Sequence, residues 1–448
     1  MRDIKHLTRK KPGFTAPLFG RSKRRLGNSF KTVNPPKRRA RLCYLLPFIA
    51  LLLAAYPVHS ILTSVNLYKP ARKPVAESKV NPSPIGALNG LQAFQLAVSS
   101  MQNWRSEGGR LQAPLAVGGV VDYTIDEEVQ NRVKKIMEEY QVPYGVFVAV
   151  EPKTGRVLAL VGHSSVAPEW GRNSFFNVYP MASLFKIITA ASALEQKKIE
   201  PNTVFAFRGG AYSENPKYWS VNPRGSKQHM NLTVAMGKSI NPVFGRLASD
   251  VVGKDSIMAY AGKFGFNQVL FPGITVTPSK AEVPRNDAEL KLMGAGLGRE
   301  VKISPLHAAT VIAAIANHGQ MMSPALAQEI RNGAGSVVFS QSPQALRRLV
   351  TPETAGQLAK MLSTTVNSGT SRKAFHDRRG RPKLASINIC AKTGSINGKE
   401  PEGRYTWFAA YAPAEDPKIA LVALVINQDR WKIKASYVGE QALEAFFK

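Results

Sequence analysis

The chain contains a serine and a lysine whose spacing suits nucleophilic catalysis. Ser183 and Lys186 stand three residues apart at the start of an apolar segment that runs to Glu195. If this segment is helical, the two residues share one face, so the Lys186 amine can reach the Ser183 hydroxyl. A serine beside a potential base is the minimum equipment for acyl transfer. The Ser183 amide, at the N-terminus of the helix, would favour developing negative charge.

The pair has a simpler interpretation that must be weighed. Ser183 and Lys186 form the only Ser-x-x-Lys in the chain. An N-cap serine followed by a solvated lysine would have the same sequence. The residues that follow are apolar nearly all round, whereas a surface helix carries a polar face. We therefore expect the helix to be buried at the centre of a domain.

A serine whose base is lysine needs further polar groups. Free lysine has a pKa of ~10.4, and a second cation nearby would lower it. A hydroxyl is also needed to pass the proton to the leaving group. The chain offers Ser239 and Asn241 in a Ser-x-Asn sequence, and Lys392 in a later Lys-Thr-Gly sequence.

The order Ser-x-x-Lys, Ser-x-Asn, Lys-Thr-Gly resembles the transpeptidase domain of penicillin-binding proteins, in the serine β-lactamase-like superfamily. The two shorter sequences also occur elsewhere. Ser220 begins the main rival for the second motif, and Lys153 begins a second Lys-Thr-Gly that we expect in a structural hairpin turn. The segment around Ser239, and the strand-like residues after Lys392, match the family's surroundings of these motifs.

The resemblance implies a role for each catalytic residue. Ser183 would attack the substrate carbonyl and a neutral Lys186 would take its proton. Ser239 and Lys392 would relay a proton to the leaving group, and Asn241 would orient Lys186 and the substrate amide.

The resemblance also implies a substrate-binding strand. Thr393 and Ser395 would hold the substrate carboxylate, the Ser183 and Ser395 amides would form the oxyanion hole, and Gly394 would allow close approach. Ala182 stands where many members of the family have glycine.

The activity implied is that of a D,D-transpeptidase, which cross-links peptidoglycan stem peptides through a serine acyl-enzyme and is acylated by β-lactams. A D,D-carboxypeptidase, a β-lactamase and a non-catalytic β-lactam-binding scaffold are the alternatives. No cofactor or metal is expected, because the chain has two cysteines and no His-Glu-x-x-His or Cys-x-x-Cys spacing.

The elements that must position these residues predict an α+β domain. Helical patterns dominate its middle and strand patterns its two ends, so the first hairpin should share a sheet with the last strands. The resemblance implies a five-stranded antiparallel sheet flanked by helices, with an all-helical subdomain. The predicted helices cover 127–140, 231–252, 256–264, 305–317, 352–366 and 439–447. The predicted strands cover 144–150, 156–161, 389–393, 406–412 and 419–426.

The N-terminal region has a different composition. Residues 1–41 hold 14 Lys and Arg against the single Asp3, with Pro and Gly interspersed, in a chain of net charge +30. This predicts a disordered basic tail rather than a nucleic-acid-binding module. Residues 42–63 contain no Lys, Arg, Asp or Glu, and as a helix they would span roughly 33 Å, enough to cross a bilayer. A long signal peptide is the alternative.

The order of these segments predicts a location. The positive-inside rule places the tail in the cytoplasm and the catalytic domain outside, anchored by one span in the bacterial cytoplasmic membrane. Residues 64–119, rich in Pro, Lys and Ser at first and with a short helix at 91–104, are expected to be a linker or stalk. The transpeptidase domain would cover 120–448. The expected partners are stem peptides, β-lactams and inner-membrane cell-wall synthesis proteins, with no nucleic acid.

Overall fold

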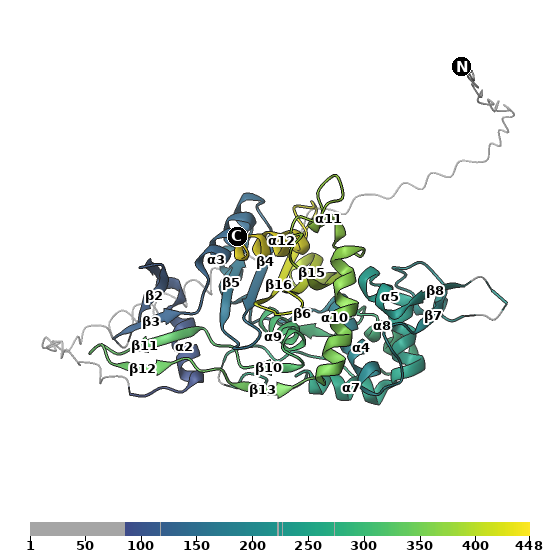
Figure 1. The fold of residues 1–448 in the computed structure, drawn as a ribbon, viewed down its shortest axis with the longest axis horizontal. Helices are drawn as coiled ribbons and strands as arrows, with labels where there is room; N and C mark the ends of the chain where they lie inside the picture. The colour runs from purple at the N-terminus through teal and green to yellow at the C-terminus, as the bar shows by residue number, and fades with distance from the viewer. Residues whose placement is uncertain (1–85, 117, 222–223, 226, 273) are drawn as a thin grey trace, which may run out of the picture. The chain divides into compact units, whose positions relative to one another are not determined.

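A computed structural model describes residues 86–448, apart from 117, 222–223, 226 and 273 (Figure 1). The predicted basic tail and membrane helix, residues 1–41 and 42–63, lie outside the described residues. Within the described part of the chain, no helix combines the length and the apolar character needed to cross a membrane.

The centre of the domain is a five-stranded antiparallel sheet in the order β14-β15-β16-β4-β5. The predicted pairing is confirmed, because the first hairpin (β4, β5) joins the last three strands. Every residue of β16 is buried, as expected for a central strand covered on both faces. The strands are β4 (Tyr144–Val150), β5 (Val157–His163), β14 (Cys390–Lys399), β15 (Glu402–Ala412) and β16 (Ile419–Asn427).

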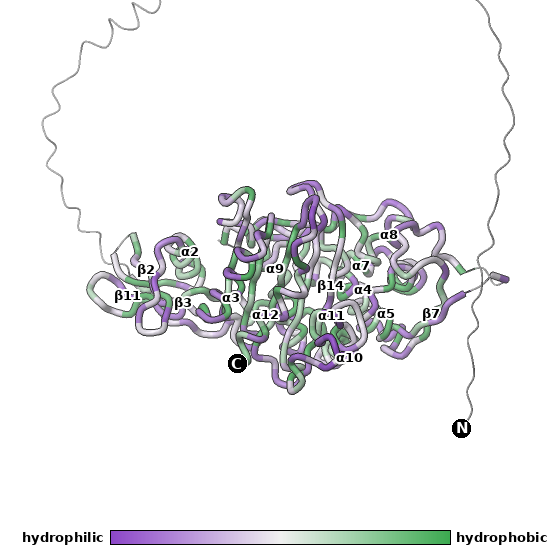
Figure 2. Tube along the Cα trace, turned by 90° about the horizontal axis from the view of Figure 1, so that it is seen from above, coloured by the Kyte–Doolittle hydropathy of each residue, from purple (hydrophilic) through white to green (hydrophobic). Residues whose placement is uncertain are grey.

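Helices cover both faces of this sheet (Figure 1). On one face, α3 (Glu127–Glu139) and α12 (Ala435–Phe446) pack against alternate residues of β4 and β16. On the other face lies α9 (Pro305–Ala316), all of whose residues are buried. The Ser304 hydroxyl caps α9 by accepting from the His307 amide at 3.2 Å. Figure 2 shows the resulting pattern, with hydrophobic segments inside and hydrophilic ones on the outer loops.

A set of helices that includes α10 forms the all-helical subdomain. Its apolar side chains belong to the same core cluster as those of α9. Its helices are α4 (Lys186–Glu195), α5 (Leu232–Lys238), α6 (Asn241–Arg246), the π-helical turn η6 (Leu247–Val252), α7 (Lys254–Lys263), α8 (Asp287–Gly294) and α10 (Pro352–Asn367).

The prediction of one helical stretch over 231–252 was wrong in detail. The chain breaks between α5 and α6, where Ser239 adopts a left-handed conformation with φ of +56°. A left-handed residue ends a helix and redirects the chain. Because of this break, the side chains of Ser239 and Asn241 both point towards Lys186.

The expectation of a linker over all of 64–119 was also wrong for its described part. There, the short helix expected at 91–104 is present as α2 (Gly90–Ser100), and two strands that were not predicted follow it, β1 (Arg105–Glu107) and β2 (Arg110–Pro114). They join a second antiparallel sheet with β3 (Val120–Tyr123), β11 (Ala327–Arg331) and β12 (Val337–Ser340).

Apolar contacts hold this N-terminal part to the domain. Ala93, Phe94 and Ala97 of α2 are buried in the main core, and the Tyr123 hydroxyl donates to the Ala97 carbonyl at 2.8 Å. The folded domain therefore begins before Val120.

The remaining short elements connect these layers. They are η2 (Met101–Asn103), η3 (Pro168–Asn173), β6 (Tyr179–Pro180), η4 (Ala182–Phe185), β7 (Val204–Phe207), η5 (Pro216–Tyr218), β8 (Gln228–Asn231), β9 (Lys302–Ile303), β10 (Gln320–Met322), β13 (Ala345–Arg348) and α11 (Arg372–Phe375).

Candidate active site

The predicted nucleophile and base meet at the start of α4. Ser183 lies in the 3₁₀ turn η4, which runs directly into α4 at Lys186. Residues three apart eclipse one another in a 3₁₀ turn, and Lys186 Nζ lies 2.8 Å from Ser183 Oγ. The Lys186 side chain is fully buried. The alternative of an N-cap beside a solvated lysine is therefore excluded.

The second motif supplies three more oxygen atoms to this amine. Lys186 Nζ lies 2.7 Å from Asn241 Oδ1 and 3.2 Å from both the carbonyl and the hydroxyl oxygen of Ser239. These contacts exist because the chain turns between α5 and α6 at the left-handed Ser239. Backbone strain of this kind is often found at functional sites.

The third motif completes the cluster from the central sheet. Lys392, on β14, donates to Ser239 Oγ at 2.8 Å and to the Thr393 carbonyl at 2.8 Å. A continuous chain of hydrogen-bonding groups therefore runs from Ser183 through Lys186 and Ser239 to Lys392. All five predicted catalytic residues come together.

Burial sets the protonation of the two lysines. It is the largest cause that lowers the pKa of Lys186 well below its ordinary value, and the nearby charge of Lys392 lowers it further. Burial also lowers the pKa of Lys392 to about 7. The sequence correctly predicted that the charge of Lys392 lowers the pKa of Lys186. It gave this charge as the main cause, whereas burial of Lys186 is the larger cause.

Glycine at two positions allows the nucleophile to sit against its neighbours. A Cβ on Gly394 would lie 3.3 Å from the Ser183 amide nitrogen, so this amide and β14 are in direct proximity. Gly296 has a φ of +70°, and a Cβ there would clash with the Ala182 carbonyl and lie 2.7 Å from Ser183 Cα.

Ala182 itself has a φ of +53°. This left-handed conformation explains why glycine suits the position, since it has no Cβ to strain the backbone there.

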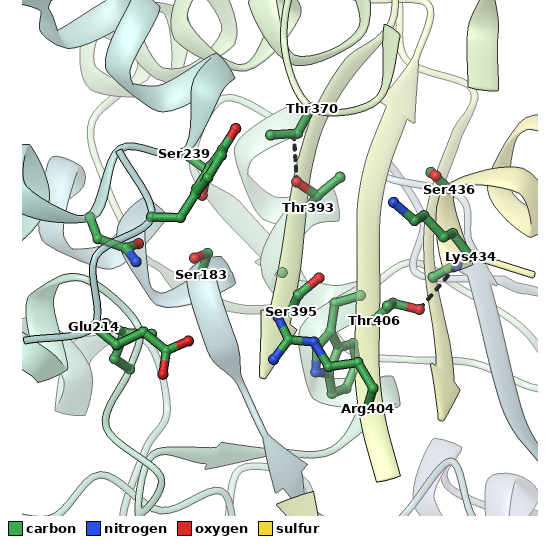
Figure 3. A pocket seen from close by; sticks show the side chains of 16 residues that line it. Ser183, Glu214, Ser239, Thr370, Thr393, Ser395, Arg404, Thr406, Lys434 and Ser436 are labelled. Atoms are coloured by element: carbon green, nitrogen blue, oxygen red, sulfur yellow. Dashed lines mark hydrogen bonds between the residues drawn. The ribbon is translucent and has the colours of Figure 1, made fainter. Parts of the chain in front are cut away.

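These residues open onto a cavity of about 370 Å³ (Figure 3). Ser183, Ser239 and Asn241 line it together with the predicted substrate-binding residues Thr393, Gly394 and Ser395. Lys186 and Lys392 are fully buried and are not among its lining residues.

Sequence reasoning missed the other polar residues of the cavity. The Thr370 and Thr393 hydroxyls share a hydrogen bond of 2.5 Å. The further polar lining residues are Tyr212, Glu214, Arg404, Thr406, Lys434 and Ser436. They come from separate loops and strands and share no motif, so only the tertiary fold identifies them.

The rival motifs lie elsewhere. Ser220 is exposed and does not line the cavity. Lys153 lies in the β4–β5 turn, as predicted, and its ammonium pairs with Asp416 at 2.8 Å. Ser213 begins another Ser-x-Asn sequence, and its carbonyl supports the second motif by accepting from Asn241 Nδ2 at 3.2 Å.

Sequence comparisons agree with this geometry. Residues 145–447 match the sequence model of the penicillin binding protein transpeptidase domain. The peptidoglycan D,D-transpeptidase PbpA of Mycolicibacterium smegmatis is 29% identical over 345 residues, which cover 69% of this chain and 67% of that protein. Stage V sporulation protein D of Bacillus subtilis is 26% identical over 340 residues, covering 68% of this chain and 49% of that protein.

Solved structures show the same fold. Penicillin-binding protein A from Mycobacterium tuberculosis superposes with a TM-score of 0.60 at 26% identity, covering 73% of this chain and 82% of that one. Its ceftriaxone acyl-enzyme complex also gives 0.60 at 26% identity, with 73% and 80% covered. With its three motifs assembled at one cavity, the chain belongs to the penicillin-binding protein transpeptidase domain family.

Proposed function

We propose that this chain is a serine D,D-transpeptidase that cross-links peptidoglycan stem peptides and is acylated by β-lactams at Ser183. The observation that carries the proposal is the buried chain of contacts from Ser183 through Lys186 and Ser239 to Lys392. The similar mycobacterial proteins are named peptidoglycan D,D-transpeptidases, and one of them forms acyl-enzyme complexes with β-lactams.

Acylation begins at the Ser183 hydroxyl. A neutral Lys186 accepts the hydroxyl proton as Ser183 Oγ attacks the carbonyl carbon of the penultimate D-Ala. Burial keeps Lys186 in the neutral form that this step requires. The carbonyl oxygen gains negative charge, which the Ser183 and Ser395 amides stabilise from the η4 turn and the adjacent strand.

The leaving D-Ala needs a proton on its nitrogen. Lys186, now protonated, passes a proton to Ser239 Oγ, 3.2 Å away, and Ser239 donates its own proton to the departing amine. Asn241 Oδ1 holds the Lys186 amine in line during this transfer. The Ser239 contact with Lys392 favours a hydroxyl that is oriented towards the cavity.

The substrate's terminal carboxylate binds beside β14. The Thr393 and Ser395 hydroxyls donate to it, and the Lys392 ammonium supplies the opposite charge. β14 is one of the two edge strands of the central sheet, so an extended peptide can lie along its free backbone groups.

The acyl-enzyme is then resolved by an amine from a second stem peptide. The amine attacks the Ser183 ester, the ester bond breaks, and the new amide is the cross-link. Attack by water would give a carboxypeptidase, and rapid attack by water on a penicilloyl ester would give a β-lactamase.

Labelling by a fluorescent penicillin tests the proposal. The parent should become labelled and keep the label for many minutes, while Ser183→Ala should not be labelled. Ser220→Ala is the matched control and should label like the parent. Label on Ser183→Ala would refute the nucleophile assignment. Loss of label within seconds would favour a β-lactamase, and release of D-Ala without a cross-linked product would favour a carboxypeptidase.

We propose further that residues 42–63 anchor the domain in the bacterial cytoplasmic membrane, with residues 1–41 in the cytoplasm and the catalytic domain outside. Their lack of charged residues and the basic flank support this. Such an anchor would place the domain beside other inner-membrane cell-wall synthesis proteins. Cell fractionation tests it: penicillin-labelled protein should sediment with membranes after a carbonate wash, and removal of residues 1–63 should release it.

A further inference from the structure

Asn241 is held from two directions. On one side its Oδ1 accepts from Lys186 Nζ at 2.7 Å. On the other side it contacts residues 211–219, the segment that contains η5. Its Nδ2 donates to the Ser213 carbonyl at 3.2 Å, and its backbone amide donates to the Ala211 carbonyl at 2.8 Å. The segment 211–219 therefore touches the residue that orients the catalytic base.

The Ser213 carbonyl decides which end of the Asn241 amide faces Lys186. A backbone carbonyl accepts hydrogen bonds and cannot donate them. Asn241 must therefore turn its Nδ2 donor towards Ser213, which leaves the Oδ1 acceptor facing Lys186. If this carbonyl moved away, the amide could rotate and present its N–H groups to Lys186. A neutral amine has one lone pair, and an N–H donor there would compete for it with the Ser183 hydroxyl.

The segment 211–219 has one buried anchor, which is Trp219. Of residues 211–220, all of which the structure describes, only Trp219 is buried, and it is fully buried. Its ring lies against α6 at Gly245, where an added Cβ would clash with the indole. Gly245 follows Asn241 by one helical turn, on the same face of α6. Trp219 therefore packs on the helix that carries Asn241.

The indole of Trp219 is joined to the carbonyl that holds Asn241. Its Nε1 donates to Ser213 Oγ at 3.1 Å, which supplies the partner that a buried indole N–H requires. The hydroxyl and the carbonyl of Ser213 belong to one residue, so holding the first limits the movement of the second. A closed set of contacts thus runs from α6 through Trp219 and Ser213 back to Asn241.

The residues on either side of Ser213 give this carbonyl no other buried support. Tyr212 is 64% exposed and Glu214 is also exposed. Both line the catalytic cavity, and Figure 3 shows Glu214 across the cavity from Arg404. The position of the Ser213 carbonyl therefore depends on Trp219 more than on its own neighbours.

We propose that Trp219 is a positioning residue for the acylation of Ser183. Its N–H holds Ser213, and the Ser213 carbonyl holds the Asn241 amide. In that orientation the amide leaves the Lys186 lone pair free to accept the Ser183 proton. This inference rests on the proposed acylation of Ser183. A small displacement of a positioning group can slow a reaction severely, and loss of one neutral hydrogen bond corresponds to roughly a fivefold change.

Single-turnover acylation by benzylpenicillin, followed by intact mass, tests the role. Trp219→Phe keeps an aromatic ring but removes the N–H, and it should lower the acylation rate constant roughly fivefold. Ser213→Ala should lower it equally, whereas Ser213→Thr, which keeps the hydroxyl, should retain the parent rate. Trp104→Phe is the matched control, because Trp104 is half-buried and does not line the cavity.

Double substitutions separate positioning from general damage to the fold. If Trp219 acts through Ser213, Trp219→Phe with Ser213→Ala should be roughly fivefold slower than the parent, like each change alone. Independent effects would multiply to about 25-fold. Asn241→Ala leaves no amide to position, so adding Trp219→Phe should not slow that variant further. Loss of packing would slow acylation in both backgrounds.

Three results would overturn the positioning role alone. They are a parent rate in Trp219→Phe, a fall of about 25-fold in the double variant, and a further fall when Trp219→Phe is added to Asn241→Ala. If Trp219→Phe does not fold, Ser213 decides the case, because equal rates in Ser213→Ala and Ser213→Thr would also overturn the role. If the parent is not acylated at Ser183, the proposed transpeptidase function is wrong, and the positioning role falls with it.

Discussion

The coupling between the two buried lysines gives a prediction that can be worked out from distances. Lys186 Nζ and Lys392 Nζ lie 3.2 and 2.8 Å from the same atom, Ser239 Oγ, so they are at most about 6 Å apart. Two unit charges at that separation repel by about 3 kcal/mol at an effective dielectric of 20. This is roughly a hundredfold in an equilibrium constant.

The perturbation is Lys392→Gln, which removes the charge but keeps a donor for Ser239. The pKa of Lys186 should rise, because one of the two causes that lower it is gone, although burial still holds it below its ordinary value. Less of Lys186 is then neutral at low pH. Through this route acylation should fall by up to roughly a hundredfold at the acid end and recover as the pH is raised.

The parent should behave in the opposite way at the alkaline end. The pKa of Lys392 is about 7, so its ammonium, to which we assign the ligand carboxylate, is lost as the pH rises through that value. Acylation of the parent should therefore decline above about pH 7, whereas Lys392→Gln should show no such decline.

The assay is single-turnover acylation by benzylpenicillin between pH 5 and pH 9, followed by intact mass. Lys238→Gln is the matched control, because Lys238 is exposed at the end of α5. If Lys392→Gln acylates at the parent rate with the parent pH profile, the two lysines are not coupled and the reasoning is wrong.

Three further predictions concern stability and positioning. Lys392→Met should raise the free energy of unfolding by a few kcal/mol at pH 7, as measured by thermal unfolding. The reason is that the pKa of Lys392 is about 7 in the folded protein, whereas its ordinary value in the unfolded chain is 10.5. Since the unfolded chain binds more protons between these values, parent stability rises with pH and the gain should shrink towards pH 10; a gain independent of pH would contradict the burial argument. Gly296→Ala should lower the rate of acylation by benzylpenicillin at least tenfold, because its Cβ would displace the Ala182 carbonyl. An unchanged rate would show that the η4 backbone shifts to accommodate the Cβ without affecting Ser183. Thr370→Val should weaken acylation about fivefold through loss of the Thr393 contact, as measured by competition with fluorescent penicillin, and parent-like competition would exclude a role for Thr370.

The meeting of the five candidate catalytic residues could be predicted because each lies in a short motif whose order along the chain is characteristic. The central sheet and its covering helices could be predicted because β16 and α9 are nearly uniformly apolar. Arg404, Lys434 and Ser436 could not, since β15 and the start of α12 meet only through tertiary packing.

The N-terminal part of the domain was missed for a related reason. Strands β1 and β2 are short and partly polar, and they are strands because β1 pairs with β2 and β2 pairs with β3. The alternation of exposed and buried residues in β2 is too short to distinguish a strand from a turn by its pattern alone.

The hydrogen bond between Ser239 and Lys392 joins two parts of the fold, since Ser239 belongs to the helical subdomain and Lys392 to the central sheet. Each part can contribute its motif only after the other has folded against it. Penicillin labelling is therefore a covalent reporter of native docking. In a urea titration, labelling should be lost no later than the global unfolding transition. A molecule whose two parts have separated would not be labelled by penicillin, even while its secondary structure persists.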